Sequence, residues 1–322
     1  MSEDVLRIGL VGVGGVCDAV HYPGFSRIPG VEIVGLCEPS DALRAARKAE
    51  WGIDACYAEL GAMLEEVKPD AVAIATPNVY HCELILQALE AGCHVMCEKP
   101  FTIDPGQAWR IDELRKAKNR EVVIAFGWNY RPMVQQAKQM MDEFGIGSLE
   151  HMTITMSSVT RELLSNTGAY PDAAPETVPE QGTWTDKKMS GGGYGQAQLS
   201  HALGLALWLT KARAEGAFAL MSAPLAAPVE LHDAVTYRFE NGAIGVMSGS
   251  SAHTDAWGNR HSLEVRGMGS AGQFLIDVER EAFWLHSDGK DRTLDIPEGD
   301  GLYDCAGPID AVLSAARGKS FI

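Results

Sequence analysis

Residues 7–17 read RIGLVGVGGVC, an apolar run that opens into the closely spaced Gly12, Gly14 and Gly15. The run predicts a buried β-strand. Gly12 permits a tight turn and Gly14 lets the backbone approach a pyrophosphate, while the helix that follows points its free N–H groups at the phosphates. Cys17 stands where a third glycine often lies. Taken alone, a plain turn explains these glycines equally well.

A second strand supports the nucleotide-binding interpretation. Residues 32–37 read EIVGLC and lead into Glu38, which is placed to accept hydrogen bonds from an adenosine ribose. A carboxylate at this point repels a 2′-phosphate, so the sequence favours NAD over NADP. The alternative is that Glu38 is an acidic residue at a helix start, before Ser40.

Strands and helices then continue to alternate. Further apolar runs predict strands at 71–75, 95–97 and 122–126. The predicted helices are 40–51 with Ser40 as N-cap, 59–67, 79–91 with Gly92 after its end, and one that a capping box opens at Asp104. This alternation predicts a doubly wound parallel sheet, a Rossmann domain of residues 1–128.

Residues 94–101 (HVMCEKPF) place an acid and a base at the end of one of these strands. The strand must stop at Pro100, because proline cannot donate a ladder hydrogen bond. Ligands bind at the carboxyl ends of the strands in an open parallel sheet, so Lys99 can reach a substrate hydroxyl or carbonyl there. The alternative is that Glu98 and Lys99 form a solvated surface pair.

From Asn129 the pattern changes. A helix at 133–144 and a strand at 149–160 precede a proline-bearing loop at 168–189, and Gly191, Gly192 and Gly193 then open an apolar helix at 194–211. The rest reads as hairpins with turns at Asn241-Gly242, near residue 270 and at Asp288-Gly289. We expect an α+β domain of residues 129–322 with a large, mainly antiparallel open sheet.

The overall composition excludes some classes of function. Apolar residues make up 46% and charged residues 22% of the 322 residues, and the formal net charge is −16 without a basic stripe, which argues against nucleic-acid binding. No apolar run has membrane-spanning length and no signal-peptide pattern opens the chain, so we expect a cytoplasmic protein. None of the seven cysteines forms a Cys-x-x-Cys pair, so neither a metal site nor a disulfide framework is expected.

The chain resembles the Gfo/Idh/MocA oxidoreductases through several motifs in order. These are Gly12 to Gly15 with His21 and Pro23, Ala75-Thr76-Pro77-Asn78 with His81, residues 88–95, Glu98-Lys99-Pro100, and Gly191 to Gly193 with His201. The resemblance implies an NAD(P)-binding first domain and a second-domain sheet that mediates a homo-oligomer, a dimer or tetramer. It also implies oxidation of a secondary alcohol of a sugar or cyclitol.

The same resemblance implies roles for individual residues. Lys99 and His201 are the expected catalytic residues. The expected cofactor-binding residues are Gly12, Gly14, Gly15, Val16, Glu38, Thr76, Asn78, His81, Glu98, Lys99 and Asn129. The expected substrate contacts are Lys99, Tyr130, Arg131, Tyr194 and His201. For Tyr130, Arg131 and Tyr194, ordinary packing or surface roles are equally good explanations.

Departures from the family pattern bear on the mechanism. Ala197 and Gly204 stand where the family has acids, which makes the pocket more neutral and leaves His201 without its carboxylate neighbour; the alternative for His201 is a core histidine. Trp184-Thr185-Asp186 only partly matches a family motif. The chain stops at Ile322 after 311–317 has begun a helix, so the second domain is either shorter than in the family or truncated.

The function predicted is reversible hydride transfer between a sugar, glycoside or cyclitol and NAD, with Lys99 as the base. A cationic nicotinamide beside Lys99 would discourage its protonation. One alternative is a non-redox elimination or glycoside cleavage through transient oxidation at C3 with NAD tightly bound. Another is a non-catalytic NAD-binding protein.

Overall fold

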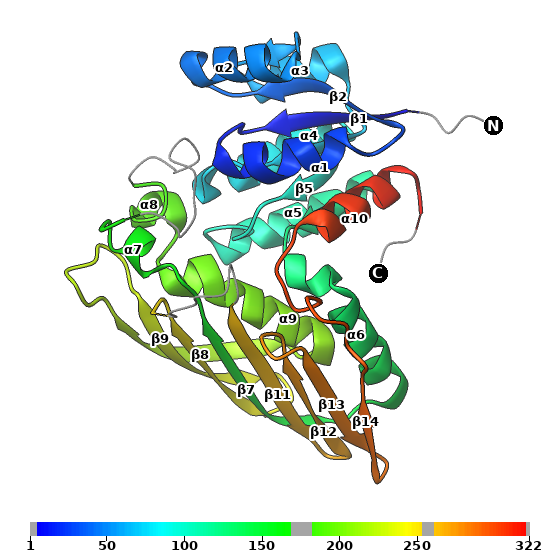
Figure 1. Ribbon diagram of the computed structural model, residues 1–322, viewed down its shortest axis with the longest axis vertical. Helices are drawn as coiled ribbons and strands as arrows, with labels where there is room; N and C mark the ends of the chain where they lie inside the picture. The colour runs from blue at the N-terminus through cyan, green and yellow to red at the C-terminus, as the bar shows by residue number, and fades with distance from the viewer. Residues whose placement is uncertain (1–4, 169–181, 253–260, 320–322) are drawn as a thin grey trace.

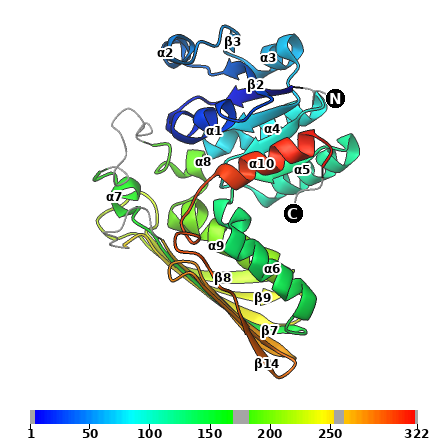
Figure 2. The same ribbon diagram turned by 45° about the vertical axis from the view of Figure 1, so that its right-hand side comes forward.

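The computed structural model describes residues 5–168, 182–252 and 261–319. Two lobes are stacked along the long axis, each built on one β-sheet (Figure 1). Helices of the second lobe lie between the two sheets, so the far face of the second sheet is left open (Figure 2). This layering puts the end of the first sheet next to helices of the second lobe.

The first sheet has six strands in the order β3-β2-β1-β4-β5-β6, and its paired strands run parallel. Its strands are β1 (Leu6–Val11), β2 (Val31–Cys37), β3 (Cys56–Tyr57), β4 (Ala71–Ile74), β5 (His94–Cys97) and β6 (Val122–Ile124). The order reverses beside β1, which confirms the predicted doubly wound sheet. Ligands bind at such a reversal.

The predicted helices of this lobe begin within two residues of the expected positions. The helical segments of the lobe are a π-helical turn η1 (Cys17–His21), α1 (Tyr22–Ser26), α2 (Asp41–Trp51), α3 (Leu60–Val67), a 3₁₀ turn η2 (Asn78–Tyr80), α4 (His81–Glu90) and α5 (Pro105–Lys118). Ser40 Oγ accepts the N–H of Leu43 at 3.4 Å, and Asp104 Oδ1 accepts that of Gly106 at 2.8 Å. Both predicted N-caps are therefore confirmed.

The second sheet has eight strands in the order β14-β13-β12-β11-β7-β10-β9-β8. They are β7 (Leu149–Ser157), β8 (Ala214–Ser222), β9 (His232–Phe239), β10 (Ile244–Ser250), β11 (Ser262–Gly269), β12 (Gly272–Asp277), β13 (Ala282–Ser287) and β14 (Lys290–Thr293). β7 and β10 run parallel and the other described pairs are antiparallel, so the prediction of a mainly antiparallel sheet is confirmed. β8 was not predicted, because all nine of its residues are exposed and it lacks an alternating buried face.

The two long helices of the second lobe, at 132–144 and 200–210, pack on one face of this sheet, and shorter helical segments accompany them. In chain order, the helical segments are a 3₁₀ turn η3 (Gly127–Tyr130), α6 (Pro132–Phe144), α7 (Arg161–Leu164), α8 (Lys187–Ser190), a π-helical segment η5 (Gly195–Leu199) and α9 (Ser200–Thr210). The predicted helix 194–211 thus begins with π-helical turns. Most of the predicted loop 168–189 lies outside the described residues.

The last helix, α10 (Ala306–Ala316), returns to the first lobe. Its Ile309 and Val312 belong to the same buried cluster as Ile8 and Leu10 of β1. The chain therefore crosses between the lobes twice, near residues 127–131 and again near 299–305 (Figure 1). These two crossings frame the candidate site.

Candidate active site

The glycine loop after β1 is shaped for close approach by a ligand. Gly12 has a φ of +76°, and a Cβ built there would lie 2.7 Å from the Ala75 carbonyl oxygen, so a side chain would collide with the end of β4. A Cβ at Gly14 would meet no atom within 4 Å. The loop is therefore tight behind Gly12 and open in front of Gly14, as a bound pyrophosphate requires.

Glu38, at the end of β2, holds this loop. Its Oε1 accepts the N–H of Ser40 at 2.9 Å and its Oε2 accepts that of Val13 at 3.3 Å. From α2, Arg47 Nε donates to the Val13 carbonyl at 3.2 Å, and its Nη2 pairs with Asp18 at 2.8 Å. The Glu38 carboxylate is thus fixed beside the glycine loop. No sequence signal distinguished Arg47 from the other basic residues of its polar helix.

Lys99 lies at the carboxyl end of β5 and faces the second lobe. Its Nζ donates to the Ala197 carbonyl of η5 at 3.4 Å and lies 5.4 Å from the centre of the Trp184 ring. Burial lowers the pKa of the Lys99 ammonium below its ordinary value, although the charges of Glu98 and Cys305 oppose this. In a π-helix the usual i→i−4 hydrogen-bond pattern is interrupted, and such segments are frequent at functional sites.

Glu98, beside Lys99, joins the Glu-Lys-Pro segment to the helix after the glycine loop. Its Oε1 lies 3.0 Å from Nε2 of His21, which is fully buried. Burial alone would raise the pKa of Glu98, but the hydrogen bond and charge of His21, together with Lys99, leave that pKa below its ordinary value. His21 was part of the sequence motif, but sequence reasoning had assigned it no role.

The loop after β4 contains three of the predicted cofactor residues. Asn78 Nδ2 donates to the Ser190 carbonyl of α8 at 2.8 Å. The fully buried His81 lies with Nδ1 2.9 Å from the Pro100 carbonyl and Nε2 2.9 Å from the Thr76 carbonyl, and burial lowers its pKa. His81 therefore ties the β4 loop to the Glu-Lys-Pro segment.

Two of the predicted cofactor-binding residues carry a buried polar atom that is not satisfied within the described part of the chain. The atoms are Thr76 Oγ1 and Asn129 Oδ1. Buried polar atoms normally have hydrogen-bond partners. A dinucleotide carrying ribose hydroxyls and a carboxamide is chemically suited to supply them.

His201, on α9, faces Lys99 across the lobes and is only 3% exposed. Its ring makes edge contacts with Trp128 at 5.2 Å and Tyr303 at 5.4 Å between ring centres. Burial, and then the charges of Lys99 and His261, lower its pKa well below the ordinary value, so the ring is neutral at neutral pH. Its Nδ1 has no hydrogen-bond partner among the described residues. His201 is thus suited to bind a substrate hydroxyl.

Three predicted substrate residues are directed to other partners. Tyr194 is fully buried, and its hydroxyl lies 3.3 Å from the Met156 carbonyl, inside the second lobe. Tyr130 packs with the core around α10, and burial raises its pKa to about 12. The Arg131 guanidinium bonds to the crossing at 299–305. We therefore leave these three out of the proposed substrate contacts.

Trp128, Tyr303 and Cys305 were missed by sequence reasoning. Trp128 belongs to the first crossing and the other two to the second, more than 170 positions further along the chain. No local pattern links residues so far apart. Trp184 was noted only as part of a weak motif match.

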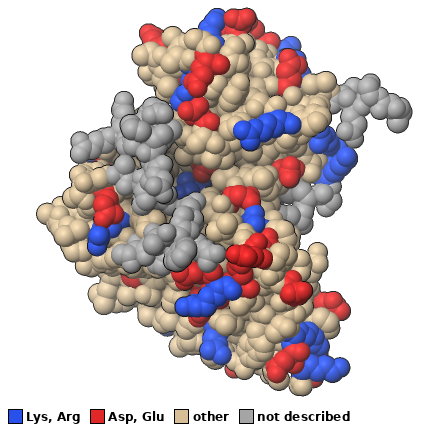
Figure 3. Space-filling view, in the orientation of Figure 1, with Lys and Arg blue, Asp and Glu red and all other residues tan. Residues whose placement is uncertain are grey.

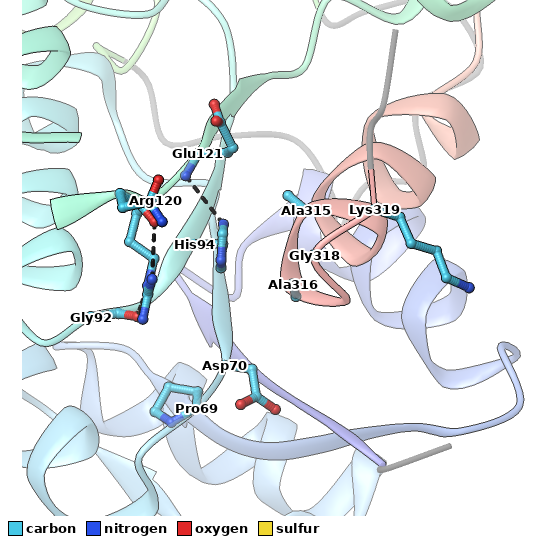
Figure 4. Close-up of a pocket in the computed structure, with 11 residues that line it drawn as sticks. Pro69, Asp70, Gly92, His94, Arg120, Glu121, Ala315, Ala316, Gly318 and Lys319 are labelled. Atoms are coloured by element: carbon cyan, nitrogen blue, oxygen red, sulfur yellow. Dashed lines mark hydrogen bonds between the residues drawn. The ribbon is translucent and has the colours of Figure 1, made fainter. Parts of the chain in front are cut away.

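A hollow of about 840 Å³ lies at the amino ends of β4, β5 and β6 (Figure 4). Lys99 lies at the opposite, carboxyl end of β5. The hollow adjoins the C-terminal ends of α4, α5 and α10. Arg120 donates to the carbonyls of Gly92 and Asn119 there, and His94 Nδ1 accepts the N–H of Glu121 at 3.1 Å. Cations near helix C-termini neutralise the helix dipoles. This hollow therefore needs no ligand to explain its charged residues.

Other site chemistries receive no support from the described residues. No three His, Cys, Asp or Glu side chains among them gather to hold a metal ion. No helix within the described ranges has the length and apolarity to span a membrane. On the face shown in Figure 3, acidic and basic side chains are interspersed.

A buried acid lies behind the helix that carries His201. Asp233 of β9 is 4% exposed and faces Gly195, and burial, followed by the charge of Glu230, raises its pKa from 3.8 to about 6. The folded state therefore holds this proton more tightly than the unfolded chain, and stability is lost as the pH rises from about 4 to 6.

Replacing Asp233 by Asn removes this penalty. We expect the free energy of unfolding at pH 8 to increase by on the order of 3 kcal/mol, and to be nearly unchanged at pH 3.5. Urea unfolding at both pH values measures the effect, with the exposed Asp295→Asn as the control. An equal effect at both pH values would show that the carboxylate charge is not the cause.

Comparison with known proteins places the fold and site in a class. The parallel sheet with its glycine loop defines an NAD-binding Rossmann oxidoreductase: the model described as "Oxidoreductase family, NAD-binding Rossmann fold" matches residues 6–126. The model described as "GFO/IDH/MocA C-terminal domain" matches residues 134–273. The chain therefore belongs to the Gfo/Idh/MocA family of oxidoreductases, as its motifs predicted.

Several relatives carry sugar or cyclitol names. D-glucoside 3-dehydrogenase of Escherichia coli is 32% identical over 193 residues, which cover 60% of this chain and 50% of that protein. Inositol 2-dehydrogenase 4 of Saccharopolyspora erythraea is 33% identical over 150 residues, 46% of this chain and 44% of that protein. The matches thus span about half the length of these curated relatives.

Solved structures share the fold over nearly the whole chain. A levoglucosan dehydrogenase in complex with NADH and levoglucosan has a TM-score of 0.75 at 21% identity, with 98% of this chain and 91% of that chain covered. An inositol dehydrogenase homologue from Azotobacter vinelandii, in complex with NAD⁺, has a TM-score of 0.76 at 20% identity, with coverages of 98% and 86%. At this identity the likeness concerns the fold.

Proposed function

We propose that this protein is an NAD-dependent dehydrogenase that transfers a hydride between a secondary alcohol of a sugar, glycoside or cyclitol and nicotinamide. One observation carries the proposal. Lys99, at the carboxyl end of β5, donates to the Ala197 carbonyl four residues before His201, so a base and a neutral imidazole face one another across the two lobes. The glycoside, inositol and levoglucosan substrates named for relatives support this substrate class.

The residues around the loop fit a dinucleotide. Gly12, Gly14, Gly15 and Val16 would hold the pyrophosphate, with Glu38 at the adenosine ribose and Thr76 and Asn129 toward the nicotinamide. Glu38 favours NAD over NADP, because its fixed carboxylate would repel a 2′-phosphate. When bound, NAD supplies the hydride acceptor.

The chain's own residues handle the proton and the substrate. Lys99, with its pKa lowered by burial, takes the hydroxyl proton as its neutral amine. His201 binds the same hydroxyl and holds it in position. Position 197 adds no carboxylate charge beside Lys99, so the charges that favour protonation of the lysine are those of Glu98 and Cys305, and burial outweighs them.

In the first experiment the protein is incubated with NAD and each of a panel of monosaccharides, glycosides and inositols. The reaction is monitored by the absorbance of the reduced nicotinamide, and the products are analysed. Net reduction of NAD with an oxidised product supports the proposal. Cleavage of a glycoside without net absorbance change, with NAD retained through gel filtration, would instead establish the transient-oxidation reaction, which the absence of an acid at Ala197 also permits. Bound NAD without any turnover would indicate a non-catalytic protein.

The open face of the second sheet supports a homo-oligomer. Strand register places exposed apolar side chains from β8, β10 and β11 on the face opposite the helices. They are Phe218 (66% exposed), Leu220 (66%), Ile244 (58%), Val246 (42%) and Met268 (40%). Clustered apolar side chains on one exposed face are typical of a protein interface.

A charge in this face is expected to dissociate the oligomer. Val246→Asp should convert it to monomers at micromolar concentration, because an unpaired carboxylate would be buried in the interface. Light scattering coupled to gel filtration measures the mass. Trp109→Asp, at an exposed aromatic residue of α5 in the first lobe, is the control. A monomeric wild-type protein would exclude this interface.

A further inference from the structure

The first crossing packs closely against the second crossing and against the start of α10. A Cβ at Gly127 in the first crossing would lie 2.0 Å from the Asp304 carbonyl oxygen of the second. A Cβ at Gly307 would lie 2.1 Å from Tyr130 Cβ. Real Cβ atoms do not approach neighbours so closely, so glycine is required at both positions. The crossings are thus interlocked rather than merely adjacent.

Arg131 ties the crossings together with nearly its whole guanidinium group. Its Nε donates to the Asp300 carbonyl at 2.9 Å, and its Nη2 donates to the Gly299 carbonyl at 2.9 Å and to Asp300 Oδ1 at 3.2 Å. Its Nη1 pairs with Asp304. Asp300 Oδ2 in turn accepts the N–H of Met133 at 2.6 Å, at the start of α6. A planar, multidentate group of this kind fixes geometry in a way that a lysine cannot.

Each crossing contributes one aromatic ring that contacts His201. Trp128 comes from the first crossing, and its Nε1 donates to the Gly301 carbonyl of the second at 3.0 Å. Tyr303 comes from the second crossing, and its hydroxyl donates to the Ala125 carbonyl just after β6 at 3.1 Å. The two rings meet edge to face at 4.8 Å. The imidazole is therefore positioned by both crossings at once.

We propose that Arg131 is a positioning residue that locks the two crossings and so holds His201 opposite Lys99. This inference rests on the proposed dehydrogenase function for its kinetic consequence. Lys99 belongs to the first lobe and His201 to the second, so their relative position depends on how the lobes are joined. Arg131 acts on this geometry through Trp128 and Tyr303 and does not touch the substrate.

The test compares Arg131→Met with Arg280→Met. Arg280 also pairs with an aspartate, Asp277 at 2.7 Å, but its side chain is 72% exposed and makes no hydrogen bond to either crossing among the described residues. We expect Arg131→Met to lower kcat/KM by about 10–100-fold, since misplacement of reacting groups by about 1 Å costs this much. NAD affinity should fall much less than kcat/KM, by about threefold at most, because the glycine loop is untouched and only Asn129 of the proposed cofactor contacts lies in a crossing. Arg280→Met should behave as wild type.

Hydrogen exchange separates positioning from a local structural role without using activity. We expect Arg131→Met to increase amide exchange at 126–133, at 299–307 and also at 195–205 around His201, with 263–276 unchanged. Increased exchange confined to the crossings, or unchanged kinetics and exchange, would overturn the proposal. If Arg131→Met does not fold, the same measurements are made on Asp304→Asn, which weakens only the ion pair between Arg131 and Asp304. A wild-type protein that oxidises no alcohol overturns the proposed function, while the exchange measurement still tests the lock.

Discussion

Replacement of Lys99 by Met is expected to lower the rate of alcohol oxidation by about 10²–10⁴-fold, the usual contribution of a positioned general base. Methionine fills most of the same space but cannot accept a proton. The contacts that Lys99 Nζ makes are with the Ala197 carbonyl and the Trp184 ring. No carboxylate among the described residues forms a salt bridge with Lys99, so the substitution breaks none. NAD affinity, measured by fluorescence titration, should change less than about threefold.

The pH dependence gives the sharper form of this prediction. Because burial lowers the pKa of Lys99, kcat/KM of the wild type should rise with pH to a plateau that begins below the ordinary lysine value of 10.5. Ala197→Asp adds an anion near the amine, raises its pKa and should move this rise to higher pH, whereas the uncharged Ala197→Asn should not. Turnover of Lys99→Met at the wild-type rate would remove Lys99 from the chemistry.

Replacement of Gly12 by Ala is expected to weaken NAD binding by roughly 100-fold, equivalent to about 3 kcal/mol. The backbone at Gly12 has φ +76°, and the new Cβ would lie 2.7 Å from both the Ala75 carbonyl oxygen and Thr76 Cγ2. The loop must therefore move away from β4, which displaces the N–H groups that we propose bind the pyrophosphate. Isothermal titration calorimetry with NAD measures the loss.

Gly52→Ala is the matched control for this effect. Gly52 ends α2 with φ +69°, but a Cβ there would meet nothing within 4 Å. Both variants carry the cost of a left-handed backbone, about 1–2 kcal/mol of stability. Only Gly12→Ala should lose NAD affinity. Equal NAD affinity in the two variants would show that the close approach to β4 does not shape the cofactor site.

Local sequence was sufficient for most of the first lobe, although the two-residue strand β3 was not predicted. The strands β1, β4 and β5 are short apolar runs flanked by glycine, proline or polar residues, and the helix starts at Ser40 and Asp104 carry their own caps. Each signal depends on residues within a few positions of one another. Local sequence did not predict β8, because its residues have no buried side and therefore no alternating pattern. Its hydrogen-bonded pairing with β9 makes it a strand.

The sequence by itself determined the parallel sheet, the glycine loop and the placement of Lys99 at a strand end, because these depend on backbone conformation and burial within short segments. Only the tertiary structure decided which side chains surround Lys99 and His201. Trp128, Tyr303 and the partners of Arg131 come together through the interlocked crossings at 127–131 and 299–305. Such contacts depend on how the two lobes pack, so no pattern of residues along the chain predicts them.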